Sequence, residues 1–227
     1  MDQMGKTKTG VCVFCGNVGV VTADHVPPRG IFPNPQPNGI KLITVPACEK
    51  CNGGSSKEDE EFKLFTSFKS GMDDAHCLKL HESAKRTLAN NGRLKCEFQK
   101  NSKMVHMTDP FTGLLTPMIE LKYDAKPILK VTKKIIYGLH YHCFKKLLPQ
   151  DVTCIIILED MLTNDHKDFL LSIIEDMKIS GAFFSIGKND EFACLYSGTE
   201  VEYATSWLLM FNKKTYVWGL TFPPTKN

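Results

Sequence analysis

The segment "ACEKCN", residues 47–52, places two cysteines three positions apart at a predicted tight turn. A second C-x-x-C pair, "CVFC" at residues 12–15, precedes it with 32 residues between the pairs. Two such turns supply four thiolates, the tetrahedral set that zinc prefers in structural sites. The predicted ligands of a structural Zn²⁺ are Cys12, Cys15, Cys48 and Cys51. Free thiols or a redox pair are the alternative interpretation.

The stretch between the two cysteine pairs carries an acid beside a histidine, Asp24-His25. The β-branched run over residues 18–25 predicts a strand that ends at this pair, and residues 27–39 hold five prolines and two glycines, which predict a loop. A second strand is expected over 40–47. The local order is therefore strand, loop, strand and turn.

A helix is expected to follow over residues 55–72. Ser55 or Ser56 is the predicted N-cap, and Glu58 or Asp59 would complete a capping box. Phenylalanines and Met72 at helical spacing are expected to bury one face of this helix.

The remaining chain alternates between helical and strand-like patterns. Residues 76–100 read as a helix that becomes strand-like over "RLKCEFQ" at 93–99. The further expected elements are a hairpin over 104–123, a helix over 125–149, a strand over 151–159, a helix over 164–179 and antiparallel strands over 181–222. This order predicts an α+β fold. We expect two domains, residues 1–72 and residues 73–227.

Composition narrows the class of protein further. No apolar run reaches the roughly 18–20 residues that span a membrane, and the first ten residues lack an apolar signal core. Nine cysteines, an odd number, fit a metal site with buried thiols in a reducing compartment, so a cytoplasmic protein is expected. Residues 76–150 carry nine more basic than acidic side chains, which fits either a surface facing a polyanion or a solvated helix surface.

The segments "ADHVPP" and "VPACEKCNGGSSKED" resemble the HNH, or ββα-metal, endonucleases of the subgroup with zinc-binding knuckles. The matched positions are Asp24-His25 at the strand end, Asn52 after the second cysteine pair and Lys57 at the helix start. The resemblance covers about residues 10–70, less than a third of the chain. It implies an N-terminal zinc-bound ββα-metal module, followed by a mixed α/β domain of unassigned fold.

The resemblance further implies hydrolysis of phosphodiester bonds in nucleic acid, with DNA more expected than RNA. His25 would be the general base, since a neutral imidazole accepts a proton from water at neutral pH. Asp24 and Asn52 would hold one catalytic Mg²⁺ or Mn²⁺ through oxygen atoms. Arg29 and Lys57 would contact phosphates, although a solvated role is the alternative for both. Similar small bacterial proteins suggest a role in phage defence.

One position departs from the family pattern, which has a middle Asn that orients the histidine loop. Thr44, or Asn38 in the proline loop, is the expected substitute. His25 as a plain loop residue and Asn52 as a plain turn residue stay open as alternatives. His140 and Cys143 have the spacing of ligands on one helical face, but core packing is the favoured interpretation for them.

Two other classes of function compete with an endonuclease. A non-catalytic zinc-knuckle module would bind nucleic acid or protein without cutting. Alternatively, residues 73–227 would carry an activity of their own, although no nucleophile–base pair or phosphate loop is recognisable there. Under the leading hypothesis these residues position substrate, contact a second copy of the chain or bind a partner protein.

Overall fold

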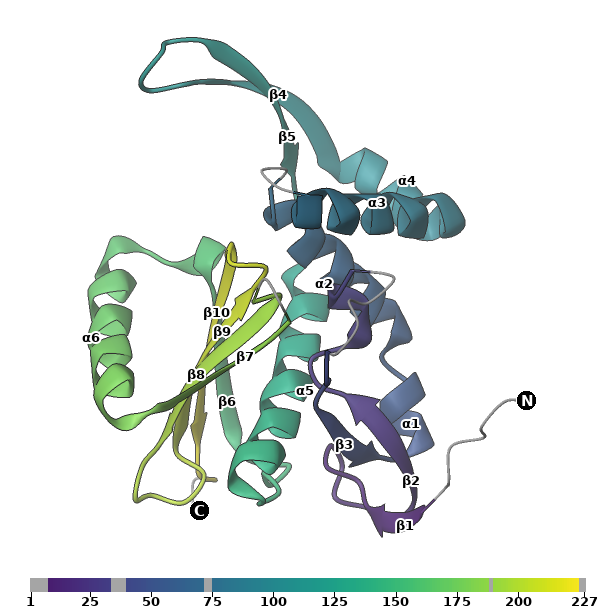
Figure 1. Cartoon of the computed structure of the whole chain (residues 1–227), viewed down its shortest axis with the longest axis vertical. Coiled ribbons are helices and arrows are strands. Elements are labelled where there is room, and N and C mark those ends of the chain that lie inside the picture. Colours follow the sequence, from purple (N-terminus) through teal and green to yellow (C-terminus); the bar gives the residue numbers. More distant parts are fainter. Residues whose placement is uncertain (1–7, 34–39, 72–74, 188–189, 225–227) are drawn as a thin grey trace.

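A computed structural model describes residues 8–33, 40–71, 75–187 and 190–224. Its N-terminal part is a small antiparallel sheet in the order β1-β2-β3, with short helices beside it (Figure 1). The elements are β1 (Lys8–Val11), β2 (Val18–His25), η1 (Arg29–Ile31), β3 (Thr44–Ala47), α1 (Glu49–Gly53) and α2 (Ser56–Lys69). The two expected strands and the later helix are found in this order, and β2 ends at His25 as predicted. β3 begins at Thr44 rather than at residue 40, and the expected turn at the second cysteine pair is the short helix α1. Residues 34–39 of the expected loop lie outside the described residues.

A helical layer and a projecting hairpin follow α2 along the chain. Their elements are α3 (Ala75–Asn90), α4 (Gly92–Asn101), β4 (Ser102–Thr108) and β5 (Leu115–Leu121). The strand expected over 93–99 is wrong, because this segment is the helix α4. Asn91 caps it by accepting a hydrogen bond from the Leu94 backbone N–H at 3.2 Å, and Leu94 is buried against Leu64 and Ala84.

The C-terminal part is a five-stranded antiparallel sheet in the order β6-β10-β9-β8-β7. Its elements, with the helices around it, are α5 (Ala125–Phe144), β6 (Thr153–Leu158), η2 (Glu159–Met161), α6 (Asn164–Ser180), β7 (Ala182–Ile186), β8 (Phe192–Gly198), β9 (Thr205–Phe211) and β10 (Thr215–Phe222). Figure 1 shows α5 between this sheet and the N-terminal one, with α6 on the far side. The mixture of helices and antiparallel sheets agrees with the expected fold class.

One hydrophobic core runs through both parts. Phe62 of α2 is fully buried and lies edge-on to Phe211 of β9, with ring centroids 5.2 Å apart. Val26 and Val45 belong to the same cluster as buried residues of α5 and the large sheet. The boundary expected near residue 72 therefore does not separate two cores. Met72, expected on the buried helix face, lies outside the described residues.

The start of α2 differs from the expected capping box. Ser55 is the N-cap residue, but its side chain makes no capping hydrogen bond to the backbone. The Ser55 hydroxyl instead donates to Asp59 Oδ2 at 3.2 Å. The Ser55 hydroxyl, expected to cap the helix, thus contacts side chains instead, and it also accepts a hydrogen bond from Lys134 of α5.

No helix among the described residues has both the length and the apolar character needed to cross a lipid bilayer.

Candidate metal centre and the Asp24 cluster

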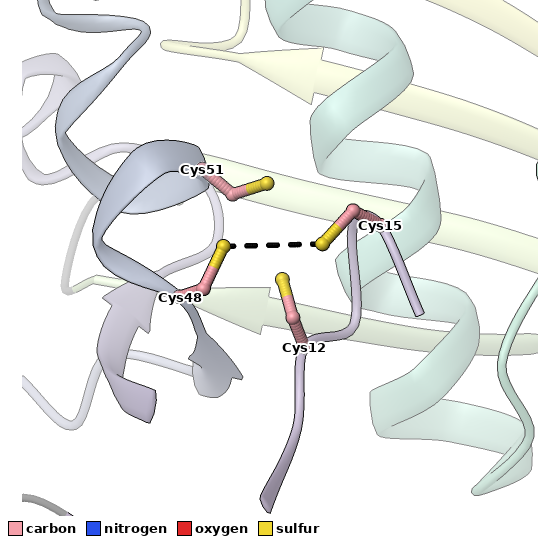
Figure 2. Close-up of side chains that lie close together, drawn as sticks. All are labelled: Cys12, Cys15, Cys48 and Cys51. Carbon is pink, nitrogen blue, oxygen red and sulfur yellow. Dashed lines mark hydrogen bonds between the residues drawn. The ribbon is translucent and has the colours of Figure 1, made fainter. Parts of the chain in front are cut away.

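The four cysteines of the two C-x-x-C turns converge on one point (Figure 2). All four Sγ atoms lie within 4.8 Å of one another, and Cys15 Sγ is 3.8 Å from Cys48 Sγ. Four sulfurs bound tetrahedrally at about 2.3 Å from zinc would be about 3.8 Å apart. Within the described residues this is the one group of three or more His, Cys, Asp or Glu side chains with metal-ligand spacing. The cluster expected from the sequence is confirmed, and its donor set and spacing fit Zn²⁺.

Backbone geometry explains why the thiols gather. The turn after β1 closes through a Gly16 N–H to Cys12 O bond of 2.9 Å, and α1 begins with the Cys51 and Asn52 N–H groups bonded to Cys48 O. Burial raises the pKa of Cys12, but backbone N–H groups, first that of Cys48, outweigh it and bring the pKa to about 7. Burial and the neighbouring Cys48 raise the pKa of Cys51. The site therefore already favours one thiolate, at Cys12.

Asp24 lies in β2 with its carboxylate turned toward α5. Its Oδ2 atom is 2.7 Å from Lys134 Nζ, and the two side chains are only 11 % and 14 % exposed. The contact is an ion pair without a well-aligned hydrogen bond at Oδ2. The same ammonium donates to Ser55 Oγ at 2.9 Å and lies 5.1 Å from the centre of the Phe14 ring. Asp24 is thus held by Lys134 of α5, which lies 110 positions further along the chain.

A second carboxylate belongs to this network, which we call the Asp24 cluster: Asp24, Lys134, Ser55 and Asp59. Burial raises the pKa of Asp59, Lys134 opposes that effect, and the negative charge of Asp24 adds to it. Asp59 Oδ1 is buried without a hydrogen-bond partner. The charge of one ammonium therefore acts on two carboxylates, and the cluster holds surplus negative charge when both are ionised.

His25 is the last residue of β2 and is half-buried. Successive side chains of a strand point to opposite faces, so His25 and Asp24 face different sides of the small sheet. The β2–β3 register pairs His25 with Thr44, one of the two residues expected to replace the middle Asn. Asn38, the other, lies outside the described residues. Thr44 is therefore placed directly across the sheet from the histidine.

Asn52 links α1 to the strand that carries Asp24 and His25. Its amide Nδ2 donates to Thr22 Oγ1 at 2.9 Å and lies 3.4 Å from Ala23 O. Among the described residues, no hydrogen bond or ion pair joins His25 to Asp24 or Asn52. The three residues thus occupy one corner of β2, β3 and α1, without forming a direct network.

The two expected phosphate contacts are both exposed. Arg29 lies in η1, and Lys57 lies in the first turn of α2. Neither forms an ion pair within the described part of the chain. Several other basic side chains are already paired, among them Lys130 with Glu58 and Arg93 with Glu61.

His140 and Cys143 do not form a second metal site among the described residues. His140 is 3 % exposed, its Nδ1 lies 2.9 Å from Lys146 O, and burial lowers its pKa. These contacts confirm the expected core packing of His140, and Cys143 is partly buried against the same core.

No match to this chain is found among protein-family models, curated proteins or solved structures. The fold and the site together define a chain of mixed α/β structure, with a cluster of four cysteines at metal-ligand spacing near its N-terminus. Lys134, Ser55 and Asp59 are the residues of the site that sequence reasoning did not connect to Asp24.

Proposed function

We propose that the chain is a metal-dependent endonuclease of the HNH type, which hydrolyses phosphodiester bonds with DNA as its expected substrate. The observation that carries the proposal is the 2.9 Å bond from Asn52 Nδ2 to Thr22 Oγ1. It ties the residue after the second cysteine pair to the strand that ends in Asp24 and His25. Two antiparallel strands and the following helix are the arrangement that the family resemblance implies.

The oxygen atoms near Asp24 suit a hard divalent cation. Asn52 uses its amide nitrogen as the donor to Thr22, which leaves its oxygen available as a ligand. The surplus negative charge of the Asp24 cluster, and the unpartnered Asp59 Oδ1, favour a cation nearby. Under the proposal Asp24 and Asn52 hold Mg²⁺ or Mn²⁺, which would neutralise charge on the phosphoryl oxygens and on the leaving oxygen.

His25 would accept the proton of the attacking water. It is half-buried at the end of β2, and the strand end would have to twist for His25 and Asp24 to face one phosphate, because successive side chains of a strand point to opposite faces. The hydroxyl-bearing Thr44 across the sheet would orient the imidazole, as the middle Asn of the family does. Arg29 on η1 and Lys57 on α2 would contact backbone phosphates. Residues 73–227 would position the substrate, since Lys134 of α5 already sets the orientation of Asp24.

The test is cleavage of plasmid DNA, single-stranded DNA and RNA by the zinc-loaded chain with Mg²⁺ or Mn²⁺. His25→Ala should lower the cleavage rate about 10²- to 10⁴-fold, the usual contribution of a general base. The matched control is His106→Ala, since His106 is exposed on the β4–β5 hairpin and should leave the rate unchanged. Equal cleavage by both variants would exclude His25 as the base.

One observation favours a second candidate function, a non-catalytic zinc-knuckle module that binds nucleic acid or protein. Asp24, the expected metal ligand, is already paired with Lys134 in a nearly buried contact. A purely structural role for Asp24 predicts binding without metal-dependent cleavage, and wild-type behaviour for His25→Ala. The same cleavage assay, run beside a binding measurement, separates the two functions.

A further inference from the structure

A polar pocket lies between α2 and α3, outside the cysteine centre and the Asp24 cluster. Its volume is about 330 Å³, near the lower end of the roughly 300–1,000 Å³ of ligand pockets. The lining residues are Glu60, Lys63, Ser83, Arg86, Thr87, Asn90 and Asn91. Those from α3 recur at spacings of three and four residues, which places them on one face of that helix.

The pocket is rich in hydrogen-bond donors. The Lys63 ammonium donates to Thr87 Oγ1 at 2.8 Å, and no other described atom accepts from it. An ammonium has three N–H groups and a guanidinium has five. Arg86 is exposed and forms no ion pair within the described residues. Most of these donors are therefore free to bind a ligand.

Charge in the pocket is positive. Lys63 and Arg86 are opposed by one carboxylate, Glu60, whose Oε2 already accepts a hydrogen bond from Asn91 Nδ2 at 2.7 Å. Burial, followed by the positive charge of Arg86, lowers the pKa of Lys63. Two cations that approach each other in a partly buried pocket are stabilised by an anion between them.

The pocket adjoins the loop that follows Asp24 and His25. The Lys63 stem packs on Gly30 of η1, where an added Cβ would lie 3.6 Å from Lys63 Cδ. Arg29, the exposed neighbour of Gly30, adds a further positive charge at this edge. The pocket therefore borders η1, the segment that follows β2 in the chain.

We propose that this pocket binds a backbone phosphate of the nucleic acid, with Lys63 and Arg86 as the principal contacts. The inference rests on the proposed function because it takes nucleic acid as the ligand, but it does not require that the chain cleaves nucleic acid. Phosphate contacts of this kind position the strand without reading its sequence. The pocket would therefore set which bond reaches His25, for any sequence.

The experiment measures binding of the zinc-loaded full chain to fluorescein-labelled duplex DNA, single-stranded DNA and RNA, without added Mg²⁺ or Mn²⁺. Arg86→Gln and Lys63→Met should each weaken binding about three- to tenfold at low salt and reduce the salt slope by about one. The matched control is Lys85→Gln, which removes the same charge from an exposed neighbour on α3 and should change affinity less than twofold. Thermal unfolding of every variant confirms that the comparison is between folded proteins.

Several outcomes would overturn the inference. Equal losses in Arg86→Gln and Lys85→Gln would mean that only general charge matters. No binding of the wild type to any of the three nucleic acids would also exclude it. So would micromolar binding of inorganic phosphate with no binding of oligonucleotides. If Arg86→Gln weakens binding while the wild type cuts nothing with Mg²⁺ or Mn²⁺, the pocket is upheld and the proposed endonuclease is not.

Discussion

The replacement Lys134→Met tests whether the Asp24 cluster stabilises the fold. Methionine keeps most of the length and apolar stem of the side chain, but it removes the ammonium 2.7 Å from Asp24 Oδ2 and 2.9 Å from Ser55 Oγ. Asp24 would then be a nearly buried carboxylate without a counter-charge. Removing one partner of a buried ion pair costs about 3–5 kcal/mol. Because the two side chains keep 14 % and 11 % exposure, we expect the lower end, about 3 kcal/mol.

A double-mutant cycle separates the ion pair from packing effects. Asp24→Asn alone leaves Lys134 without this partner and should also destabilise the fold. In the double variant neither charge remains, so its cost should be about 2 kcal/mol or more below the sum of the single costs. Some cost will persist, because Asp59 also loses the positive charge that lowers its pKa.

The measurement is urea unfolding of the zinc-loaded proteins, followed by far-ultraviolet circular dichroism and linear extrapolation. The matched control is Lys133→Met, which changes an exposed residue of the same helix whose ammonium lies 5.5 Å from the Tyr137 ring centre. It should shift the unfolding free energy by less than about 1 kcal/mol. A coupling energy within about 0.5 kcal/mol of zero would refute the reasoning, since independent sites add to that precision.

Two further predictions concern the metal centre and the packing around the histidine loop. Purified chain should contain one zinc per molecule by mass spectrometry of metals. Cys48→Ser should lose that zinc and lower the melting temperature by roughly 10 °C, because a loss of about 3–5 kcal/mol shifts the melting temperature of a chain of this size by about that much. The control Cys96→Ser changes an exposed cysteine and should keep both the zinc and the melting temperature of the wild type. Gly138→Ala should destabilise the fold by about 1–2 kcal/mol, because its Cβ would lie 2.5 Å from Val26 Cγ2, and overpacking outweighs the gain in helix propensity. Gly92→Ala, with open space at its Cβ, should be neutral or stabilising, and the Gly138→Ala cost should shrink when combined with Val26→Ala.

Patterns of neighbouring residues are sufficient to predict β2 and the cysteine cluster. The β-branched run predicted β2 to the residue, and the repeated cysteine spacing predicted which four thiols converge. For residues 93–99 the local pattern predicts a strand, and this prediction is wrong because the segment belongs to helix α4. Their apolar positions suit either type of element, and the Asn91 cap together with the packing of Leu94 on Leu64 decides for a helix.

The Asp24 cluster could not be predicted from neighbouring residues, because Asp24 and Lys134 are 110 positions apart. One signal was present in the sequence. Lys134 lies between the apolar positions of an amphipathic helix, beside Val131 and Ile135, where a lysine is rare unless it is paired. That pattern indicates a buried carboxylate partner, but only the fold identifies Asp24 as the residue.

The position of α5 explains why the candidate site and the C-terminal sheet belong to one structure. On one side, Gly138 allows the helix to approach Val26, the residue after His25, while Lys134 fixes Asp24. On the other side, Ile136 packs so closely on Gly219 of β10 that an added Cβ there would lie 2.4 Å from its Cδ1. A displacement of the large sheet would therefore move α5, and with it the ammonium that holds Asp24. The expected division at residue 72 would remove this counter-charge from the site, so the chemistry proposed for residues 1–72 depends on a helix in residues 73–227.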